Sequence, residues 1–340
     1  MDAKITKLRL SRMLSYDWLK MVAVALAAII VWVLIFTMSA TRITPAQRFT
    51  VINYEGNYSI AYSNFSKNYN EAFSNGVFSH EVIEVGSYDL TTAPDYAQSM
   101  LQAYLETDDG DVMFVSQMPN EGYEYTDGNG QTQKATYLDS LVLGYYYYLY
   151  DLDLENENGY FRQMEKYLAG YYTDGDFTNP ETLNKAKIEQ DFRTRIDENN
   201  DKRYKNDEQV QAGIKGEIER IQKYSAALIE FYGYLDEGLI SLTKTELTAK
   251  TYDGTSYTLK GTFSINLCPD ESKMGKLVEI ASYVGKKTDE NGVEQKTLMA
   301  KDMNLAILDV RGMEEGFQYE SLLYINQVIR YSRTDVAPAN

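Results

Sequence analysis

The sequence predicts an α/β protein with one N-terminal transmembrane helix and a two-lobed domain outside the membrane. Three observations support this fold class. An uncharged apolar stretch covers Met21–Ala40, strand-like and helix-like segments alternate from Phe49 to about residue 120, and the middle third of the chain is mostly helical in pattern. Strands that alternate with helices are typical of a parallel sheet covered by helices.

The stretch Met21–Ala40 is predicted to span a membrane. Its twenty positions carry no charged residue, and a helix of about 20 residues crosses the roughly 30 Å hydrocarbon core of a bilayer. Residues 1–44 carry six Lys or Arg and two Asp, a net charge of +4, whereas the whole chain carries −17. Because five of these basic residues precede the stretch, the positive-inside rule places residues 1–20 in the cytoplasm and the C-terminal domain outside the cell.

A cleaved signal peptide is the alternative interpretation of this stretch. The apolar region of a signal peptide usually has about 7–15 residues and is followed by a small-x-small cleavage site. Here the stretch is longer, and Met38-Ser39-Ala40 is a poor site because Met is not small. We therefore expect an uncleaved anchor in a bacterial cell membrane, with residues 41–48 as a linker. The residues before the span fit either a short helix at the level of the lipid headgroups or a basic segment that ends the span.

The segment after the linker predicts the order β-α-β-α-β. The segments with strand patterns, rich in β-branched and aromatic residues, are Phe49–Tyr54, Glu81–Val85 and Val112–Val115. The helical patterns between them are Asn64–Ser74 and Pro94–Glu106. Connections of this length predict parallel pairing, and we expect residues 49–120 together with 261–335 to form a first α/β lobe.

Residues 121–260 are predicted to form a second, mostly helical lobe. An aromatic run covers Tyr137–Asp151. The helical patterns that follow are Tyr160–Leu168, Glu181–Ile196 and Gln209–Leu235. The polar stretch Asp197–Glu208 between the last two lacks an apolar pattern and is read as a solvated loop or a helix end.

Strand patterns return in the last third of the chain. Thr245–Tyr252 and Ser256–Phe263 flank Asp253-Gly254, which is the strongest short signal for a hairpin. A strand pattern over Phe263–Leu267, a helix over Lys273–Val284, a strand over Asn304–Val310 and a helix over Glu320–Arg333 complete the expected elements. The continuous apolar sequence Asn304–Val310 indicates a strand that is buried on both faces, as in a parallel sheet between helix layers.

Composition excludes several functional classes. The net charge of −17 argues against nucleic acid as a partner. One His (His80) and one Cys (Cys268) exclude disulfide frameworks and metal sites that need two such ligands within one chain. The chain also has no P-loop, no dinucleotide-binding GxGxxG and no GxSxG motif. We therefore expect no cofactor, no metal and no enzymatic activity.

The remaining candidates for chemistry are weak. Cys268 and His80 have no catalytic motif around either residue, so packing is the expected role of the cysteine. The alternating carboxylates Asp151, Asp153, Glu155 and Glu157 resemble a calcium loop, but Asn156 stands where an EF-hand has its glycine. Nothing selects two of the many carboxylates as a glycosidase pair. The 30 Tyr, densest at Tyr145–Tyr148, fit either half-buried packing or a binding surface.

Two blocks of the chain resemble the extracellular solute-binding proteins of ABC importers. In Tyr96–Val115 a helix leads through a Gly-Asp turn into a strand that begins Asp-Val, as in the first lobe of those proteins. The strand Asn304–Val310 and the helical segment Tyr319–Tyr331 are similar to their late part. The resemblance implies a periplasmic-binding-protein-like ectodomain that binds a ligand between two lobes and delivers it to a permease. The chain departs from the family in having no lipoprotein Cys, and its two Trp lie near the membrane.

Two functional hypotheses follow. The first is a membrane-anchored solute-binding-like protein that captures a small polar ligand for an ABC-type permease or another membrane protein. The second is a non-catalytic scaffold or accessory subunit of a cell-envelope complex that uses the same fold. Ligands of open α/β sheets bind beyond the carboxyl ends of the strands, so the candidate ligand-binding residues lie in the turns after the first and third strands. These residues are Glu55, Asn57, Tyr58, Ser116 and Gln117.

Overall fold

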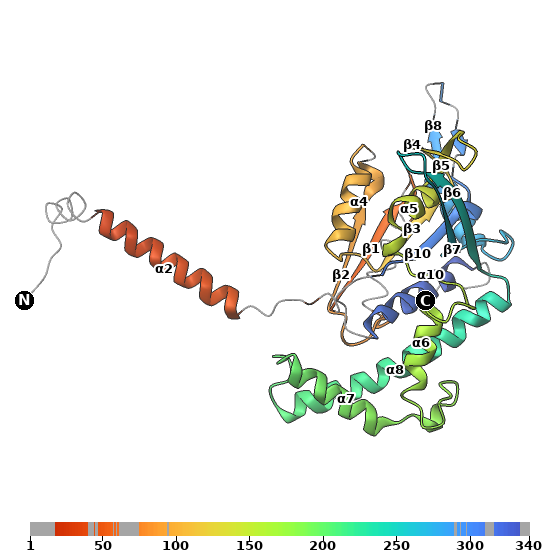
Figure 1. The fold of residues 1–340 in the computed structure, drawn as a ribbon. Helices are drawn as coiled ribbons and strands as arrows, with labels where there is room; N and C mark the ends of the chain where they lie inside the picture. The colour runs from red at the N-terminus through yellow and green to blue at the C-terminus, as the bar shows by residue number, and fades with distance from the viewer. Residues whose placement is uncertain are drawn as a thin grey trace, which may run out of the picture. The chain divides into compact units, whose positions relative to one another are not determined.

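The protein consists of two units, Met1–Ile43 and Thr44–Asn340. Figure 1 shows them in a computed structural model. The residues that the structure describes are 18–39, 44, 47–56, 58, 60, 75–93, 95–288, 291–292, 294–296, 298–309 and 316–333. The helix expected at Asn64–Ser74 and the candidate residue Asn57 lie outside them.

The first unit contains one long apolar helix. This helix, α2, covers Trp18–Ser39 and has 22 residues. Its window Trp18–Ile35 is, within the described residues, the one segment that is long and apolar enough to cross a membrane, and none of this window is buried by protein. The helix is compatible with a single-pass anchor, and its described part includes Met21–Ser39 of the predicted span.

A six-stranded mixed sheet forms the centre of the second unit, in the order β2-β1-β3-β10-β7-β6. The strands are β1 (Arg48–Tyr54), β2 (Glu84–Asp89), β3 (Val112–Ser116), β6 (Ser241–Lys250), β7 (Ser256–Asn266) and β10 (Met303–Ile307). β1 pairs in parallel with β2 and with β3, so that Ile52 lies opposite Tyr88 on one side and Met113 on the other. The α/β class and the parallel pairing of the first three strands agree with the prediction.

The direction of the last strand differs from the prediction. β10 is buried over its whole length, but it runs antiparallel to both β3 and β7, with Leu305 opposite Phe114 and Ile265. The apolar run therefore indicates that the strand is buried on both faces. Such burial occurs in parallel and in antiparallel strands alike. The second strand also differs, because β2 begins at Glu84 rather than Glu81; the Glu81 side chain is instead held in ion pairs with Arg195 and Arg203.

Helices cover both faces of the sheet (Figure 1). Those of the second unit are α4 (Ala97–Glu106), α5 (Tyr137–Tyr145), α6 (Tyr160–Ala169), α7 (Lys185–Glu198), α8 (Asp207–Asp236), α9 (Gly275–Val284) and α10 (Glu320–Ser332). One core cluster joins α4 and α5 to one face of the sheet through Ile52, Tyr54 and Met113. A larger cluster joins α6, α8, α9 and α10 to the other face, where Phe49 and Phe114 lie.

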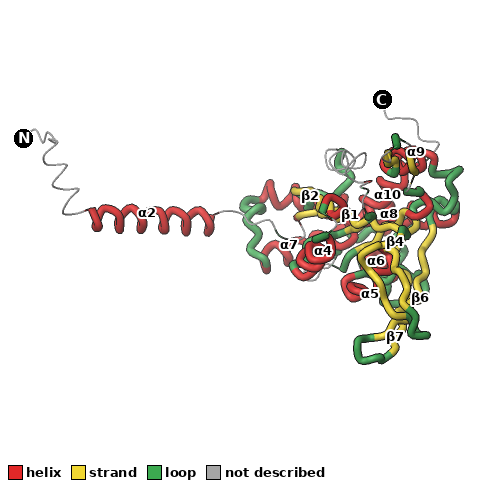
Figure 2. The backbone as a smooth tube through the Cα atoms, turned by 90° about the horizontal axis from the view of Figure 1, so that it is seen from above, coloured by secondary structure: helices red, strands yellow, loops and turns green. Residues whose placement is uncertain are grey.

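The sheet ends in an antiparallel hairpin, and two small antiparallel pairs lie outside the sheet among the described residues. The hairpin of β6 and β7 turns at Asp253-Gly254 as predicted, with Gly254 at φ +85°, and Figure 2 shows it projecting from the body. The sequence analysis did not predict the other two pairs. These pairs are β4 (Pro119–Thr126) with β5 (Thr132–Thr136), and β8 (Lys286–Thr288) with β9 (Glu294–Lys296).

The six-stranded sheet draws strands from both of the predicted lobes. β6 lies within residues 121–260, the predicted second lobe, yet it pairs along its length with β7. The mostly helical character of that segment is present in α5, α6, α7 and α8. The division of residues 44–340 into two lobes stays a prediction.

Candidate functional site

A hollow of about 310 Å³ opens where the parallel strands β1 and β2 end. It is lined by Tyr54, Gly56, Leu90, Asp95, Ala97, Gln98, Asn120, Gly122, Tyr123 and Tyr137. These residues come from the ends of β1 and β2, the first turn of α4, the strand β4 and the first residue of α5. We call this site the tyrosine hollow. Its position is the one that open α/β sheets use for ligands, and its volume lies at the small end of ligand pockets.

Two tyrosines form one wall of the tyrosine hollow. The rings of Tyr54 and Tyr137 meet edge to face, with 5.2 Å between ring centroids and 84° between ring planes. Gly56 makes this arrangement possible, because its φ is +99° and a Cβ at this position would lie 2.9 Å from Cε2 of Tyr137. Only glycine adopts this backbone conformation without strain while leaving room for the ring.

Asn120 presents an amide to the same space. Its Nδ2 donates to the Tyr54 hydroxyl at 3.4 Å and to Oγ of Ser140 at 3.1 Å. Its Oδ1 accepts no hydrogen bond within the described residues and is therefore available as an acceptor. α5 is fixed at this point by a capping box of Thr136 and Asp139, which sets the position of Tyr137 at its first turn.

The first turn of α4 forms another part of the lining. Ala97 and Gln98 line the hollow, and the helix has no acidic residue in its first turn and no side-chain cap from Tyr96. The backbone oxygen of Gln98 accepts a hydrogen bond of 3.4 Å from the Tyr145 hydroxyl. This bond ties α4 to α5 and leaves the exposed Gln98 side chain at the rim.

The tyrosine hollow is almost neutral. Burial raises the pKa of Tyr54, Tyr123 and Tyr137 above the usual 10, so the three phenols keep their protons at physiological pH. Among the described residues, Asp95 is the only charged side chain of the lining. The site can therefore stack aromatic faces on a ligand and exchange hydrogen bonds with neutral polar groups.

Of the residues predicted as the site, Glu55, Tyr58, Ser116 and Gln117 are described, and none of these four is among the lining residues of the tyrosine hollow. Glu55 and Ser116 are fully buried, Tyr58 is buried, and Gln117 is exposed. Since successive side chains of a strand alternate, Glu55 faces away from the side of β1 that carries Tyr54. Whether these residues bind a ligand stays a prediction.

Glu55 and Ser116 instead connect the ends of two strands. Oγ of Ser116 donates to the backbone oxygen of Glu55 at 3.0 Å, and the Glu55 carboxylate accepts from the backbone N–H of Ile60 at 3.3 Å. Burial, together with the nearby charge of Asp89, raises the pKa of Glu55 well above its usual value. The pair fixes the turn in which Gly56 lies.

The tyrosine hollow lies near the strand ends that were expected to carry a site, but none of the candidate residues is among its lining residues. Tyr54 was counted only as a strand residue, and Asn120 and Tyr123 lie on the unpredicted strand β4. Two signals could have indicated this strand. Tyr123 and Tyr125 alternate with polar residues, and the turn dipeptides Asp127-Gly128 and Asn129-Gly130 follow them.

A second polar cluster lies between α7, α8 and the segment before β2. We call it the buried ion network, and its members are Glu81, Arg195, Arg203, Glu217 and Arg220. Nη2 of Arg195 lies 2.9 Å from Oε1 of Glu81 and 3.2 Å from Oε2 of Glu217. Nη2 of Arg203 lies 2.7 Å from Oε2 of Glu81. Arg220, itself buried, pairs with Glu217 and donates to the Tyr167 hydroxyl at 3.0 Å.

The carboxylates of the buried ion network also lie close to His80. His80, Glu81 and Glu217 bring potential metal ligands within 4.8 Å of one another. The guanidinium groups of Arg195 and Arg203 already occupy both oxygens of Glu81, and a cation would have to displace them against charge repulsion. Burial works to raise the pKa of Glu81, but the hydrogen bond with His80 and the arginine charges lower it well below 4.5. The network is thus a structural ion cluster.

The other candidates for chemistry are engaged in the fold. Cys268 is buried, and burial raises the pKa of its thiol to about 12, so it holds no thiolate at neutral pH. The Asp151 carboxylate accepts hydrogen bonds from the backbone N–H groups of Asp153 and Thr262. It also accepts one from the side-chain amide of Asn156. These bonds hold the start of the loop and give the Asp151 carboxylate a structural role.

No protein-family model, curated protein or solved structure matches the chain. The resemblance to solute-binding proteins therefore rests on the two sequence blocks in which it was found. The case for a function comes from the geometry of the tyrosine hollow.

Proposed function

We propose that the chain is a membrane-anchored, solute-binding-like protein that captures a small neutral sugar for a membrane transporter. The tyrosine hollow at the ends of the parallel strands is the observation that carries this proposal. It offers three phenol groups, two carboxamides, one carboxylate and the apolar side chains of Leu90 and Ala97.

This set of groups fits a sugar better than a charged metabolite. The half-buried rings of Tyr123 and Tyr137 suit the C–H faces of a pyranose ring, and the amides of Gln98 and Asn120 can bridge neighbouring hydroxyls. No cationic side chain lines the hollow within the described residues, which disfavours phosphorylated and carboxylated ligands. The hydroxyl of Tyr123 forms no hydrogen bond within the same part of the chain and is free to bond a ligand.

The predicted membrane anchor and the resemblance to solute-binding proteins support the proposed location and partner. α2 holds the protein in the membrane with residues 1–20 in the cytoplasm and residues 44–340 outside, as the distribution of Lys and Arg favours. An ABC-type permease is the partner that the resemblance implies. The protein binds its ligand without converting it.

Ligand capture can be tested on the full chain in a detergent without a sugar headgroup. Monosaccharides are titrated by calorimetry into the wild type and into Gln98→Ala, which removes one amide of the lining. We expect binding to the wild type and an affinity about tenfold lower in the variant. Gln102→Ala on the same helix is the matched control, because Gln102 is exposed, its side chain bonds Glu106, and it is not among the lining residues of the hollow. Equal affinities in all three proteins, or no binding of any sugar, would refute the proposal.

A scaffold role is the second candidate, and exposed tyrosines favour it. Tyr146 and Tyr147, next to α5, expose 44% and 48% of their surface, and exposed aromatic side chains are common in protein interfaces. Chemical crosslinking in intact cells separates the two candidates. A scaffold predicts that replacing both residues by Ser abolishes crosslinks to membrane partners, whereas ligand capture predicts that sugar binding is unchanged.

A further inference from the structure

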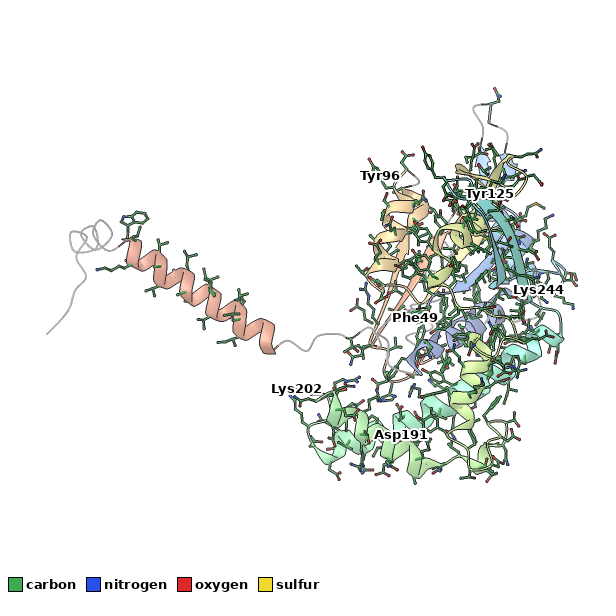
Figure 3. All side chains as sticks on the ribbon, in the orientation of Figure 1. Phe49, Tyr96, Tyr125, Asp191, Lys202 and Lys244 are labelled. Carbon is green, nitrogen blue, oxygen red and sulfur yellow. The ribbon has the colours of Figure 1, made fainter. Side chains whose placement is uncertain are left out.

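A second hollow of about 310 Å³ lies beside the tyrosine hollow. It is formed by the β4–β5 pair and the β6–β7 hairpin, which meet through the isolated bridge between Asp127 and Ala249. Tyr123 lines both hollows. The two spaces are therefore separated by no more than one side chain. Figure 3 places Tyr125, a residue of the second hollow, at the same end of the unit as Tyr96, at the start of α4 and next to the tyrosine hollow.

The second hollow repeats the chemistry of the first. Tyr125 and Tyr257 contribute half-buried rings, and Thr126 and Thr132 contribute hydroxyls. Tyr257 and Tyr54 both lie close enough to Tyr123 to raise its pKa, after the larger effect of burial. A row of rings thus runs from β1 across β4 to β7.

The second hollow differs from the first in its charges. Glu124 and Lys250 line it, and Lys250 forms no ion pair within the described residues. An ammonium group held at the rim without a carboxylate partner is a donor for ligand hydroxyls. Glu124 and Tyr125 of β4 pair with Lys134 and Gln133 of β5, so the edge of β4 that faces β5 is closed to an added strand.

We infer that the two hollows form one groove for a glycan chain of at least two sugar units, with Tyr123 between adjacent units. The inference rests on the proposed capture function and adds the length of its ligand. One unit occupies the tyrosine hollow, and the next lies against Tyr125 and Tyr257. Ring stacking on successive tyrosines accounts for both the alternation along β4 and the position of Tyr257 on the facing hairpin.

The test compares ligands of increasing length on the full chain in the same detergent. Calorimetric titrations use the monosaccharide, disaccharide and tetrasaccharide of one series, repeated for several series. We expect the affinity to rise about tenfold or more from the monosaccharide to the disaccharide. Tyr257→Ala should lower the affinity for the disaccharide about tenfold and leave that for the monosaccharide unchanged. Tyr252→Ala is the control, since Tyr252 is fully exposed at the hairpin turn.

The outcomes separate the two proposals. Binding of the monosaccharide with no gain for longer ligands, and no effect of Tyr257→Ala, would overturn the groove and leave the capture function standing. Failure of the wild type to bind any member of any series would overturn both. A loss of monosaccharide affinity in Tyr257→Ala would show that the second hollow is not a separate subsite.

Discussion

The tyrosine hollow and the buried ion network use similar polar side chains in opposite ways. In the network, both oxygens of Glu81 pair with arginines, and Arg220 bonds Glu217, Tyr167 and the backbone oxygen of Gly316. In the hollow, the Tyr123 hydroxyl and Oδ1 of Asn120 have no hydrogen-bond partner within the described residues. Polar groups that satisfy one another stabilise a fold, whereas polar groups directed into an open volume are free to bind a ligand.

The tyrosine hollow and the buried ion network also differ in the elements that they connect. The network joins α7 and α8 to the segment before β2 and to Phe317, over whose ring the Arg220 guanidinium lies at 4.6 Å. Figure 3 shows the neighbouring Lys202 and Asp191 at the end of the unit opposite Tyr96 and Tyr125. Stability and ligand binding should therefore respond to different substitutions.

The largest effect on stability is expected from Arg220→Met. The variant leaves the buried Glu217 without its closest partner, and removal of one member of a buried ion pair costs about 3–5 kcal/mol. Urea unfolding of the full chain measures the free energy of unfolding. Arg193→Met is the control, because Arg193 pairs with Glu189 on the surface of α7 and exposed pairs contribute about 0–1 kcal/mol. A similar small loss in both variants would show that the network is not structural.

Acid should weaken the network and leave the phenols of the hollow unchanged. Since the pKa of Glu81 is lower in the folded chain than its usual 4.5, its contribution to stability is present above about pH 4.5. That contribution is lost as the pH falls below this value. Melting temperatures between pH 7 and pH 3 should fall less steeply for Glu81→Gln, whose side chain cannot titrate, although this variant is less stable at pH 7. Parallel curves for the two proteins would contradict the assignment.

Gly56→Ala should affect both stability and binding. The substitution forces alanine to adopt φ +99° and adds a Cβ atom 2.9 Å from the Tyr137 ring. We expect it to lower the free energy of unfolding by about 1–3 kcal/mol. Gly254→Ala in the β6–β7 turn is the matched control, because its φ is +85° but nothing lies within 4 Å of the added Cβ. We expect a smaller loss of stability in the control and unchanged sugar binding, while Gly56→Ala loses affinity. Equal sugar affinities of the two variants would show that Tyr137 does not contribute to the binding site.

The smallest effect on stability is expected from Tyr123→Phe. The lost hydroxyl bonds no described residue, so the free energy of unfolding should change by less than about 0.5 kcal/mol. The affinity for sugar should nevertheless fall about threefold to tenfold, because one ligand hydrogen bond is lost. Calorimetry and urea unfolding measure the two quantities on the same sample. Unchanged affinity would show that the hydroxyl faces solvent when the ligand is bound.

Local patterns predicted those parts of the fold whose signals lie within a few residues. Apolar and β-branched runs located β1 and β3, and Asp253-Gly254 located the β6–β7 hairpin. The direction of β10 could not be predicted, because burial on both faces gives the same apolar run in parallel and antiparallel strands. The strand β4 was missed because its exposed residues carry little apolar signal, and Tyr54 was missed because a strand end gives no local sign of an adjacent hollow.

The place of β10 in the sheet affects the order in which the protein can fold. β3 and β10 are neighbours, with Ser116 opposite Met303, yet they are among the first and last strands of the chain. During synthesis from the N-terminus, the edge of β3 stays open until the segment around Met303 has been made. Open strand edges invite aggregation, so the nascent domain is exposed to aggregation for most of its synthesis. A protein truncated before β10 should therefore aggregate or be degraded.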